Sequence, residues 1–217
     1  MRPALLFDLD GTLVDSDGDH LIAFQEVFAP FGIAMDRALY VRDIMGAPNS
    51  AIGARFLPHL PEAERAKVLD AKEAAYRARV GEMTPTPGAK ALLDHAQAHG
   101  LACAVVTNAP RANAEIVLAA LSFAERLKTL VIGPELAHGK PHPLPYLTGL
   151  ARVGARPQDA LAFEDSLSGV RAAVAAGIAV VGITTGLPAP ALLDAGAVFA
   201  APDFTDPRIY EWIAARI

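Results

Sequence analysis

The stretch FDLDGTLVDS, residues 7–16, decides how this chain folds. It ends a short apolar run, residues 4–7, which has no alternating polar face and therefore predicts a strand buried on both sides. Asp8 and Asp10 stand two residues apart where that strand ends, and Gly11 lets the backbone turn away. We therefore expect two carboxylates to meet just beyond the edge of a sheet.

Two carboxylates that close repel each other unless something compensates for their charge. A bound metal ion would do so, as would a raised pKa on one acid, or both together. Magnesium suits a site made only of oxygen atoms, and a protonated second acid suits general acid catalysis. Aspartates at strand ends also cap loops without any chemistry, so the pair alone leaves these roles open.

Composition excludes several classes of protein. The chain has 217 residues, of which 53% are hydrophobic, enough for one core with or without a small accessory domain. A net charge of -5 argues against nucleic acid as a partner.

Cys103, the single cysteine, rules out an internal disulfide framework, and its apolar surroundings predict a buried structural thiol. With no signal peptide and no apolar stretch long enough to cross a bilayer, we expect a soluble cytoplasmic protein without membrane contact.

Residues 16–84 predict an all-helical segment. Apolar residues recur every three or four positions from Leu21 to Phe31, where Gly32 ends the helix, and the pattern stays helical over residues 36–80. The stretch TPTPG, residues 84–88, is a stiff, turn-rich connector. We expect a helical cap domain inserted between the first strand and the rest of the chain.

After this connector, buried strands and helices alternate. This order predicts an α/β fold, a Rossmann-like parallel sheet core of residues 1–15 and 85–217 with the all-helical cap, residues 16–84, inserted into it. Ligands of such sheets bind at the carboxyl ends of the strands. The expected strands are residues 102–106, 129–132, 160–163, 178–183 and 197–200, and the expected helices are residues 88–99, 111–121, 144–153, 167–176 and 206–217.

Polar residues stand directly after two of these strands, and others lie in the loop that follows a third. Thr107 and Asn108 end the strand 102–106 and can either bind phosphate oxygens or simply cap the next helix. Lys140, held between a glycine and a proline, can place a fixed positive charge near a nucleophile and a phosphoryl group, whereas we expect His142 to be a capping or solvent residue.

A second acidic pair, Glu164 and Asp165, follows the strand 160–163. Together with Asp8 and Asp10 it brings four carboxylates to neighbouring strand ends. Four such acids converging on one point predict a cation, and their oxygen atoms favour Mg2+.

With these motifs assembled, the chain resembles the haloacid dehalogenase-like superfamily, in the subgroup of beta-phosphoglucomutase and phosphoglycolate phosphatase with a helical cap after the first strand. The resemblance covers essentially the whole chain. It implies that Asp8 is a nucleophile that becomes an aspartyl-phosphate. It implies that Asp10 is the general acid and base, whose backbone carbonyl also contacts the metal.

The same resemblance assigns the remaining motifs. It implies that Thr107 and Asn108 bind phosphoryl oxygens and that Lys140 neutralises charge on Asp8 and the phosphate. It also implies that Asp165, helped by Glu164, completes a Mg2+ site with Asp8.

The cap bears on which reaction the chain performs. His20 and Lys72 fall where related caps carry a hinge histidine and a later lysine that contact substrate, although Lys72 could instead be solvated. On a helical wheel Lys72 lies with apolar residues, and Glu73 faces away. Asn49 stands where the mutase pattern carries an arginine for a second phosphate, which favours a phosphatase over a mutase.

We therefore expect a Mg2+-dependent phosphatase acting on a small phosphorylated metabolite, a sugar phosphate or similar. A phosphomutase and a non-catalytic module that binds a phosphorylated ligand are the alternatives. The sequence carries no signal for an oligomeric state.

Overall fold

A computed structural model describes residues 3–81 and 83–216, and within these residues six parallel strands form one sheet in the order β3-β2-β1-β4-β5-β6. The predicted fold class is confirmed. β1 lies at the centre, where Phe7 pairs with Val105 on one side and Phe163 on the other. The strands are β1 (Ala4–Phe7), β2 (Ala102–Thr107), β3 (Leu130–Ile132), β4 (Ala160–Glu164), β5 (Ala179–Ile183) and β6 (Phe199–Ala201).

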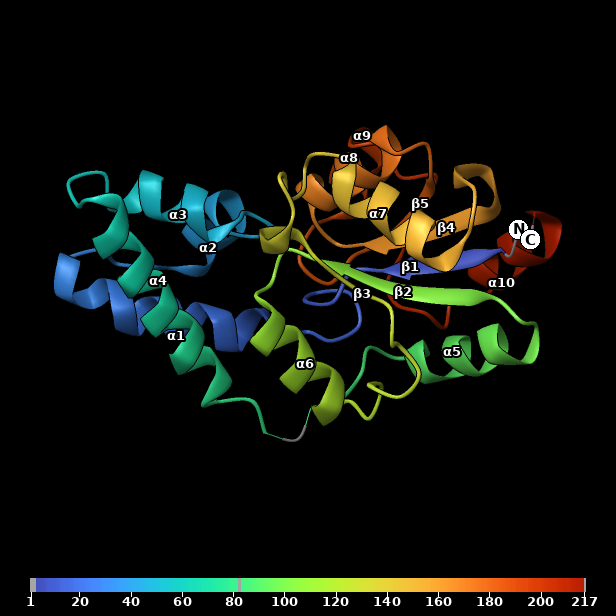
Figure 1. The fold of residues 1–217 in the computed structure, drawn as a ribbon, viewed down its shortest axis with the longest axis horizontal. Coiled ribbons are helices and arrows are strands. Elements are labelled where there is room, and N and C mark those ends of the chain that lie inside the picture. The colour runs from blue at the N-terminus through green and yellow to red at the C-terminus, as the bar shows by residue number, and fades with distance from the viewer. Residues whose placement is uncertain (1–2, 82, 217) are drawn as a thin grey trace.

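Helices cover both faces of the sheet, which explains why its strands have no polar face (Figure 1). Side chains of β1 alternate between two layers: Leu5 and Phe7 pack into one, and Ala4 and Leu6 into the other. The first layer holds α5 (Ala89–Ala98), α6 (Arg111–Ala120) and α10 (Pro207–Arg216), and the second holds α7 (Leu144–Val153), α8 (Leu167–Ala175) and α9 (Ala189–Asp194).

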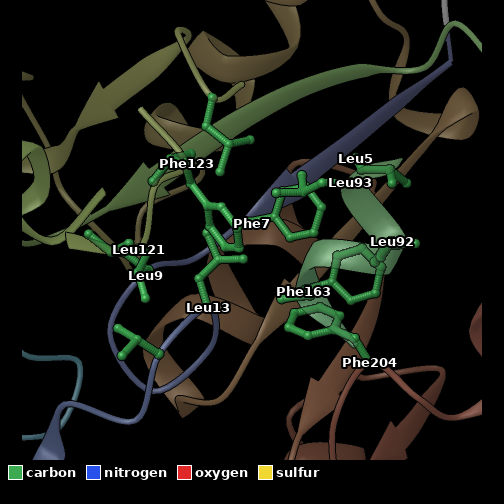
Figure 2. Close-up of a cluster of buried hydrophobic side chains, with 14 of the residues drawn as sticks. Leu5, Phe7, Leu9, Leu13, Leu92, Leu93, Leu121, Phe123, Phe163 and Phe204 are labelled. Carbon is green, nitrogen blue, oxygen red and sulfur yellow. The ribbon is translucent and has the colours of Figure 1, made fainter. Parts of the chain in front are cut away.

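Aromatic rings fill the first layer at the centre of the sheet, as Figure 2 shows. The rings of Phe7 and Phe163, from neighbouring strands, stack with centroids 5.1 Å apart, and Phe204 meets Phe163 edge-on at 5.2 Å. All three are fully buried, and burial of each such side chain contributes about 1.5–3 kcal/mol. The strands that carry Asp8 and Glu164 are therefore held rigidly side by side.

The predicted helical segment is present, on the left of Figure 1. It has a hydrophobic cluster of its own, in which Phe24, Phe28, Tyr40, Ile52 and Leu69 are buried. The boundaries of a cap domain at residues 16 and 84 stay a prediction. The segment contains α1 (Asp17–Phe28), α2 (Arg37–Asp43), α3 (Asn49–Phe56) and α4 (Glu62–Arg77).

The chain leaves the sheet and returns to it at one place. Val14 forms an isolated antiparallel bridge with Pro85. Thr86 donates its backbone N–H to the carbonyl of Leu13 at 2.9 Å and its hydroxyl to the carbonyl of Thr12 at 2.6 Å. The two crossings between helical segment and sheet are therefore hydrogen-bonded to each other.

Besides shifts of one or two residues at element ends, two details differ from the sequence prediction. The sequence pattern missed α9, because this six-residue helix buries only Leu192 among its own residues and so shows no periodicity. Cys103 is a free thiol and is partly rather than fully buried, and burial raises its pKa to about 11. The predicted closing helix reached Ile217, which lies outside the described residues, as do residues 1, 2 and 82 of the predicted domains.

Among the described residues no helix is long and apolar enough to cross a membrane.

Candidate active site

Asp8, Glu164 and Asp165 form a buried acidic cluster at the carboxyl ends of β1 and β4. Because these strands are parallel neighbours, the residues at their ends meet, and the backbone N–H of Asp8 donates to the Phe163 carbonyl at 3.0 Å. One carboxylate oxygen from each of the three acids lies within 4.8 Å of the others. The second acidic pair thus meets Asp8, one member of the first pair, at one point.

Two glycines make room for these carboxylates. A Cβ on Gly11, which has a φ of 79°, would lie 2.1 Å from an oxygen of Asp165. A Cβ on Gly169 would lie 2.0 Å from the carboxyl group of Glu164. Both carboxyl groups therefore rest against bare backbone, at positions that admit no other residue without displacing them.

Lys140 reaches into the cluster. Its Nζ lies 2.6 Å from Asp8 Oδ1 and 2.5 Å from Glu164 Oε1, and the residue is only 3% exposed. Asn108 holds the backbone of Lys140 on both sides, since its Oδ1 accepts from the Lys140 N–H at 3.0 Å and its Nδ2 donates to the Lys140 carbonyl at 3.2 Å. Lys140 is therefore a fixed charge, as its glycine and proline neighbours predict.

One lysine cannot balance three buried acids. Burial and then the charge of Glu164 raise the pKa of Asp8 to about 7, although Lys140 opposes this. Burial followed by the charges of Asp8 and Glu164 raises the pKa of Asp165 well above its usual value. For Lys140 burial acts to lower the pKa, but Asp8 and Glu164 outweigh it and raise that pKa to about 12. A cluster of carboxylate oxygens whose negative charge exceeds that of its one lysine fits a hard divalent cation.

The carboxylate of Asp10 faces the helical segment and is not part of this cluster. Its Oδ1 accepts from the hydroxyl of Ser16 at 2.7 Å and lies 3.4 Å from both His20 Nε2 and the Tyr76 hydroxyl. Burial acts to raise the pKa of Asp10, but hydrogen bonds from His20 and Ser16 lower it overall. Three of the four predicted carboxylates thus converge, and metal contact through the Asp10 carbonyl stays a prediction.

His20 and Lys72 continue the contacts of Asp10 into the helical segment. The His20 ring stacks on Tyr76 with centroids 3.8 Å apart, and Lys72 Nζ lies 3.0 Å from His20 Nδ1. Because an ammonium can only donate, Nδ1 accepts, and we infer that Nε2 carries the proton that faces Asp10. Lys72 is 3% exposed, so the interpretation of this residue as a solvated lysine is wrong.

Glu73 does not face away from Lys72, contrary to the helical-wheel prediction. It is 5% exposed and accepts from Lys72 at 3.1 Å, from Asn49 Nδ2 at 2.7 Å and from Asn113 Nδ2 at 2.6 Å. The wheel failed because α4 packs against α1 and α3 and also meets α6 of the sheet domain, so more than one of its faces is covered.

At the carboxyl end of β2, Thr107 Oγ1 accepts from the N–H of Ala109 at 2.9 Å, which leaves its hydroxyl proton free to donate elsewhere. Besides holding Lys140, Asn108 Nδ2 lies 3.3 Å from the Gly46 carbonyl of the helical segment. His142 is exposed and its Nδ1 accepts from the N–H of Leu144, the first residue of α7, which agrees with the prediction of a capping or solvent residue.

One cavity between the sheet and the helical segment connects these residues. Every predicted site residue except Glu164 lines it, namely Asp8, Asp10, His20, Asn49, Lys72, Thr107, Asn108, Lys140 and Asp165. Glu164 is fully buried, with Oε1 bonded to Lys140 and, at 2.6 Å, to the hydroxyl of Tyr146.

Sequence reasoning missed several residues that support the site. Thr12 donates its hydroxyl to Asp165 at 3.1 Å, and its place in the opening motif was an available signal. Tyr146 on α7 and Asn113 on α6 had no signal, because each looks like an ordinary helix residue until the neighbouring elements are packed against it.

The chain is similar to known proteins over most of its length. The family model of haloacid dehalogenase-like hydrolases matches residues 5–183. The chain is 34% identical over 175 residues to a phosphoglycolate phosphatase of Xylella fastidiosa, covering 80% of this chain and 76% of that protein. It is 32% identical over 210 residues to the validoxylamine A 7'-phosphate phosphatase of Streptomyces hygroscopicus subsp. limoneus, covering 96% of this chain and 97% of that protein.

Structural similarity agrees with this. The crystal structure of CbbY from Rhodobacter sphaeroides in complex with phosphate matches with a TM-score of 0.83 and 31% identity, covering 95% of this chain and 96% of that chain. The family predicted from the motifs is confirmed. With its acidic cluster, its fixed lysine and the helical segment inserted after β1, this chain belongs to the haloacid dehalogenase-like hydrolases.

Proposed function

We propose that this chain is a Mg2+-dependent phosphatase that hydrolyses a small phosphate monoester, such as a sugar phosphate, through an aspartyl-phosphate on Asp8. The observation that carries the proposal is the buried ammonium of Lys140, 2.6 Å from Asp8 and beside a second acidic pair. A phosphatase must lower the free-energy barrier to monoester hydrolysis by on the order of 20 kcal/mol or more. It therefore needs positive charge where an anionic nucleophile meets an anionic phosphate. The names of the relatives from Xylella and Streptomyces support this activity.

Mg2+ would be held by Asp8 and Asp165, by Glu164 and by the backbone carbonyl of Asp10. The raised pKa of Asp8 and of Asp165 reflects a local excess of negative charge, which a dication would offset. When bound, Mg2+ supplies neutralisation of the negative charge on the phosphoryl oxygens.

The residues of the chain divide the reaction into two displacements. An oxygen of Asp8 bonds to phosphorus while the ester P–O bond breaks, and Asp10 gives its proton to the leaving alkoxide. Asp10 then takes a proton from a water molecule, which attacks the aspartyl-phosphate to release inorganic phosphate and restore Asp8. Throughout, the Thr107 hydroxyl and the Lys140 ammonium bind the phosphoryl oxygens.

Asp10 needs to change its protonation state between these displacements. The lowered pKa of Asp10 describes the ionised form, which is the base required in the second displacement. Ser16 and His20 contact the Asp10 carboxylate, and we propose that they position it for both proton transfers.

The helical segment, residues 16–84, would act as a cap that excludes water during phosphoryl transfer. Asn49, Lys72 and His20 line the cavity from this side and would contact the leaving group or position the groups that do. Asn108 would contribute to substrate binding indirectly, because its side chain holds Lys140 and the loop at Gly46 in place. We propose the cytoplasm as the location, which the free thiol of Cys103 supports.

The proposal is tested with a panel of metabolite phosphates in Mg2+ and in EDTA. We expect release of inorganic phosphate from at least one sugar or polyol phosphate in Mg2+, and loss of that release in EDTA. Binding of the esters with no release in either buffer would instead support a non-catalytic binding module. Interconversion of sugar phosphate isomers without net phosphate release would support a phosphomutase.

Lys72→Met tests the chain of contacts from Lys72 through His20 to Asp10. Loss of the ammonium leaves His20 free to turn, which weakens protonation of the leaving group. We therefore expect kcat to fall about tenfold or more on alkyl phosphates, whose alkoxides need a proton, and much less on p-nitrophenyl phosphate. Lys67→Met, at an exposed position of the same helix, is the control. Equal losses on both kinds of ester would contradict a positioning role.

A further inference from the structure

One part of the cavity wall is built around the carboxylate of Glu73. The leaving group of a substrate lies on this side, because Asp10, which protonates it, faces the helical segment through Ser16 and His20. Glu73 lines the cavity there together with Asn49 and Asn113. These side chains come from α4, α3 and α6, so Glu73 is held from the helical segment and from the sheet domain at once.

The charges on this wall do not suit an anion. Among the described residues that line the cavity, the lysines and arginines are Lys140, which belongs to the acidic cluster, and Lys72. Lys72 Nζ lies 3.1 and 3.2 Å from the two oxygens of Glu73, so its charge is already neutralised. Asp17 adds a further carboxylate to the same cavity, where it accepts from the Tyr40 hydroxyl at 2.9 Å and lies 3.8 Å from Arg37 Nη2.

Glu73 is held in its ionised form. Burial acts to raise its pKa, but the charge of Lys72 and the hydrogen bond from Asn49 outweigh it and lower that pKa. Arg77 donates to Asn113 Oδ1 at 2.8 Å and does not line the cavity. A second anionic group on the substrate would therefore enter a wall whose described residues offer no unpaired lysine or arginine to receive it.

We infer that Glu73 is a specificity-determining residue that excludes leaving groups carrying a second phosphate or a carboxylate. The substrate is then a monophosphate whose leaving group is neutral or cationic, such as a polyol, a sugar or an amino sugar. The amide groups of Asn49 and Asn113 beside Glu73 suit hydroxyl groups of such a molecule. This inference rests on the proposed function and separates the chain from a relative named for phosphoglycolate, which carries a carboxylate.

Two matched pairs of esters test this inference in Mg2+. Glycerol 3-phosphate and 3-phosphoglycerate have the same carbon skeleton and differ in the carboxylate, and fructose 6-phosphate and fructose 1,6-bisphosphate differ in the second phosphate. For the wild-type chain we expect kcat/KM to be at least about tenfold higher for the first member of each pair, because like charges repel strongly at partly buried sites. This comparison needs no variant.

Glu73→Gln, which keeps the shape and removes the charge, should free the ammonium of Lys72. We expect the ratio of kcat/KM for the anionic member over the neutral member to rise about tenfold. Glu73→Asp keeps the charge and should keep the wild-type ratio even where total activity falls. Glu64→Gln, at an exposed position of α4, should leave ratio and activity unchanged.

Thermal unfolding establishes that each variant is folded. A wild-type preference for the anionic esters, or a folded Glu73→Gln variant with an unchanged ratio, overturns the inference while the phosphatase activity stands. Absence of turnover on all four esters overturns the proposed function and the inference with it.

Discussion

Asp8→Asn is expected to abolish turnover, with kcat reduced by at least a factor of about 10⁴ on every phosphate ester, p-nitrophenyl phosphate included. The amide has nearly the shape of the carboxyl group but cannot attack phosphorus. It also lacks the negative charge that pairs with Lys140 Nζ, which lies 2.6 Å from Asp8 Oδ1. Measurement of phosphate release in Mg2+ checks this, with trapping of a phosphorylated protein in acid as a second readout. Substantial residual activity on any ester would show that another group is the nucleophile.

The stability of the same variant shows that the lost activity is not a loss of fold. The pKa of Asp8 is raised to about 7 in the folded protein, so the folded chain binds this proton more tightly than the unfolded chain does. The stabilisation that this proton gives the folded protein is complete below the ordinary carboxyl pKa near 4 and is lost as the pH rises through about 7. In EDTA at pH 8 we therefore expect Asp8→Asn to unfold several degrees above the wild type, and at pH 4 to unfold near it. A Tm below that of the wild type at pH 8 would contradict the charge imbalance that we describe.

Lys140→Met is expected to lower kcat by about 10³-fold, because it removes the fixed cation that faces both nucleophile and phosphoryl group. It also leaves Asp8 and Glu164 without their ammonium partner in a buried cluster. Breaking a buried pair in this way costs about 3–5 kcal/mol, which denaturant unfolding in EDTA would measure. Lys90→Met, at an exposed position of α5, is the matched control.

A double variant separates charge from packing at this position. If the cost of Lys140→Met comes from unpaired carboxylates, adding Asp8→Asn removes one of them and should restore part of the stability. A coupling free energy of about 1 kcal/mol or more between the two substitutions is expected. Purely additive losses would mean that Lys140 stabilises the protein by packing, for instance against the ring of Tyr146, from which its Nζ lies 5.3 Å.

The sheet could be predicted from the sequence because its strands are apolar runs without a polar face, and such runs fit only a sheet that is covered on both sides. The run from Leu5 to Phe7 and the run from Leu161 to Phe163 are of this kind, and both are fully buried. α9 could not be predicted in this way, since a helix of six residues is too short for a 3.6-residue period to appear.

The convergence of Asp8, Glu164 and Asp165 could be predicted because topology alone brings the ends of parallel strands together. The direction of Asp10 and the burial of Glu73 could not. Beyond the end of a strand the turn after Gly11 sets where a side chain points, and no period in the sequence records it. Glu73 is placed by three helices that meet at α4, so its environment arises only from tertiary packing.

The hydrogen bonds of Thr86 to Thr12 and Leu13 place the two ends of the helical insertion side by side. A segment that departs and rejoins at a single point can be exchanged for another of different shape without stretching the strands on either side of it. One contiguous block of chain can therefore be replaced while the acids at the strand ends stay in register.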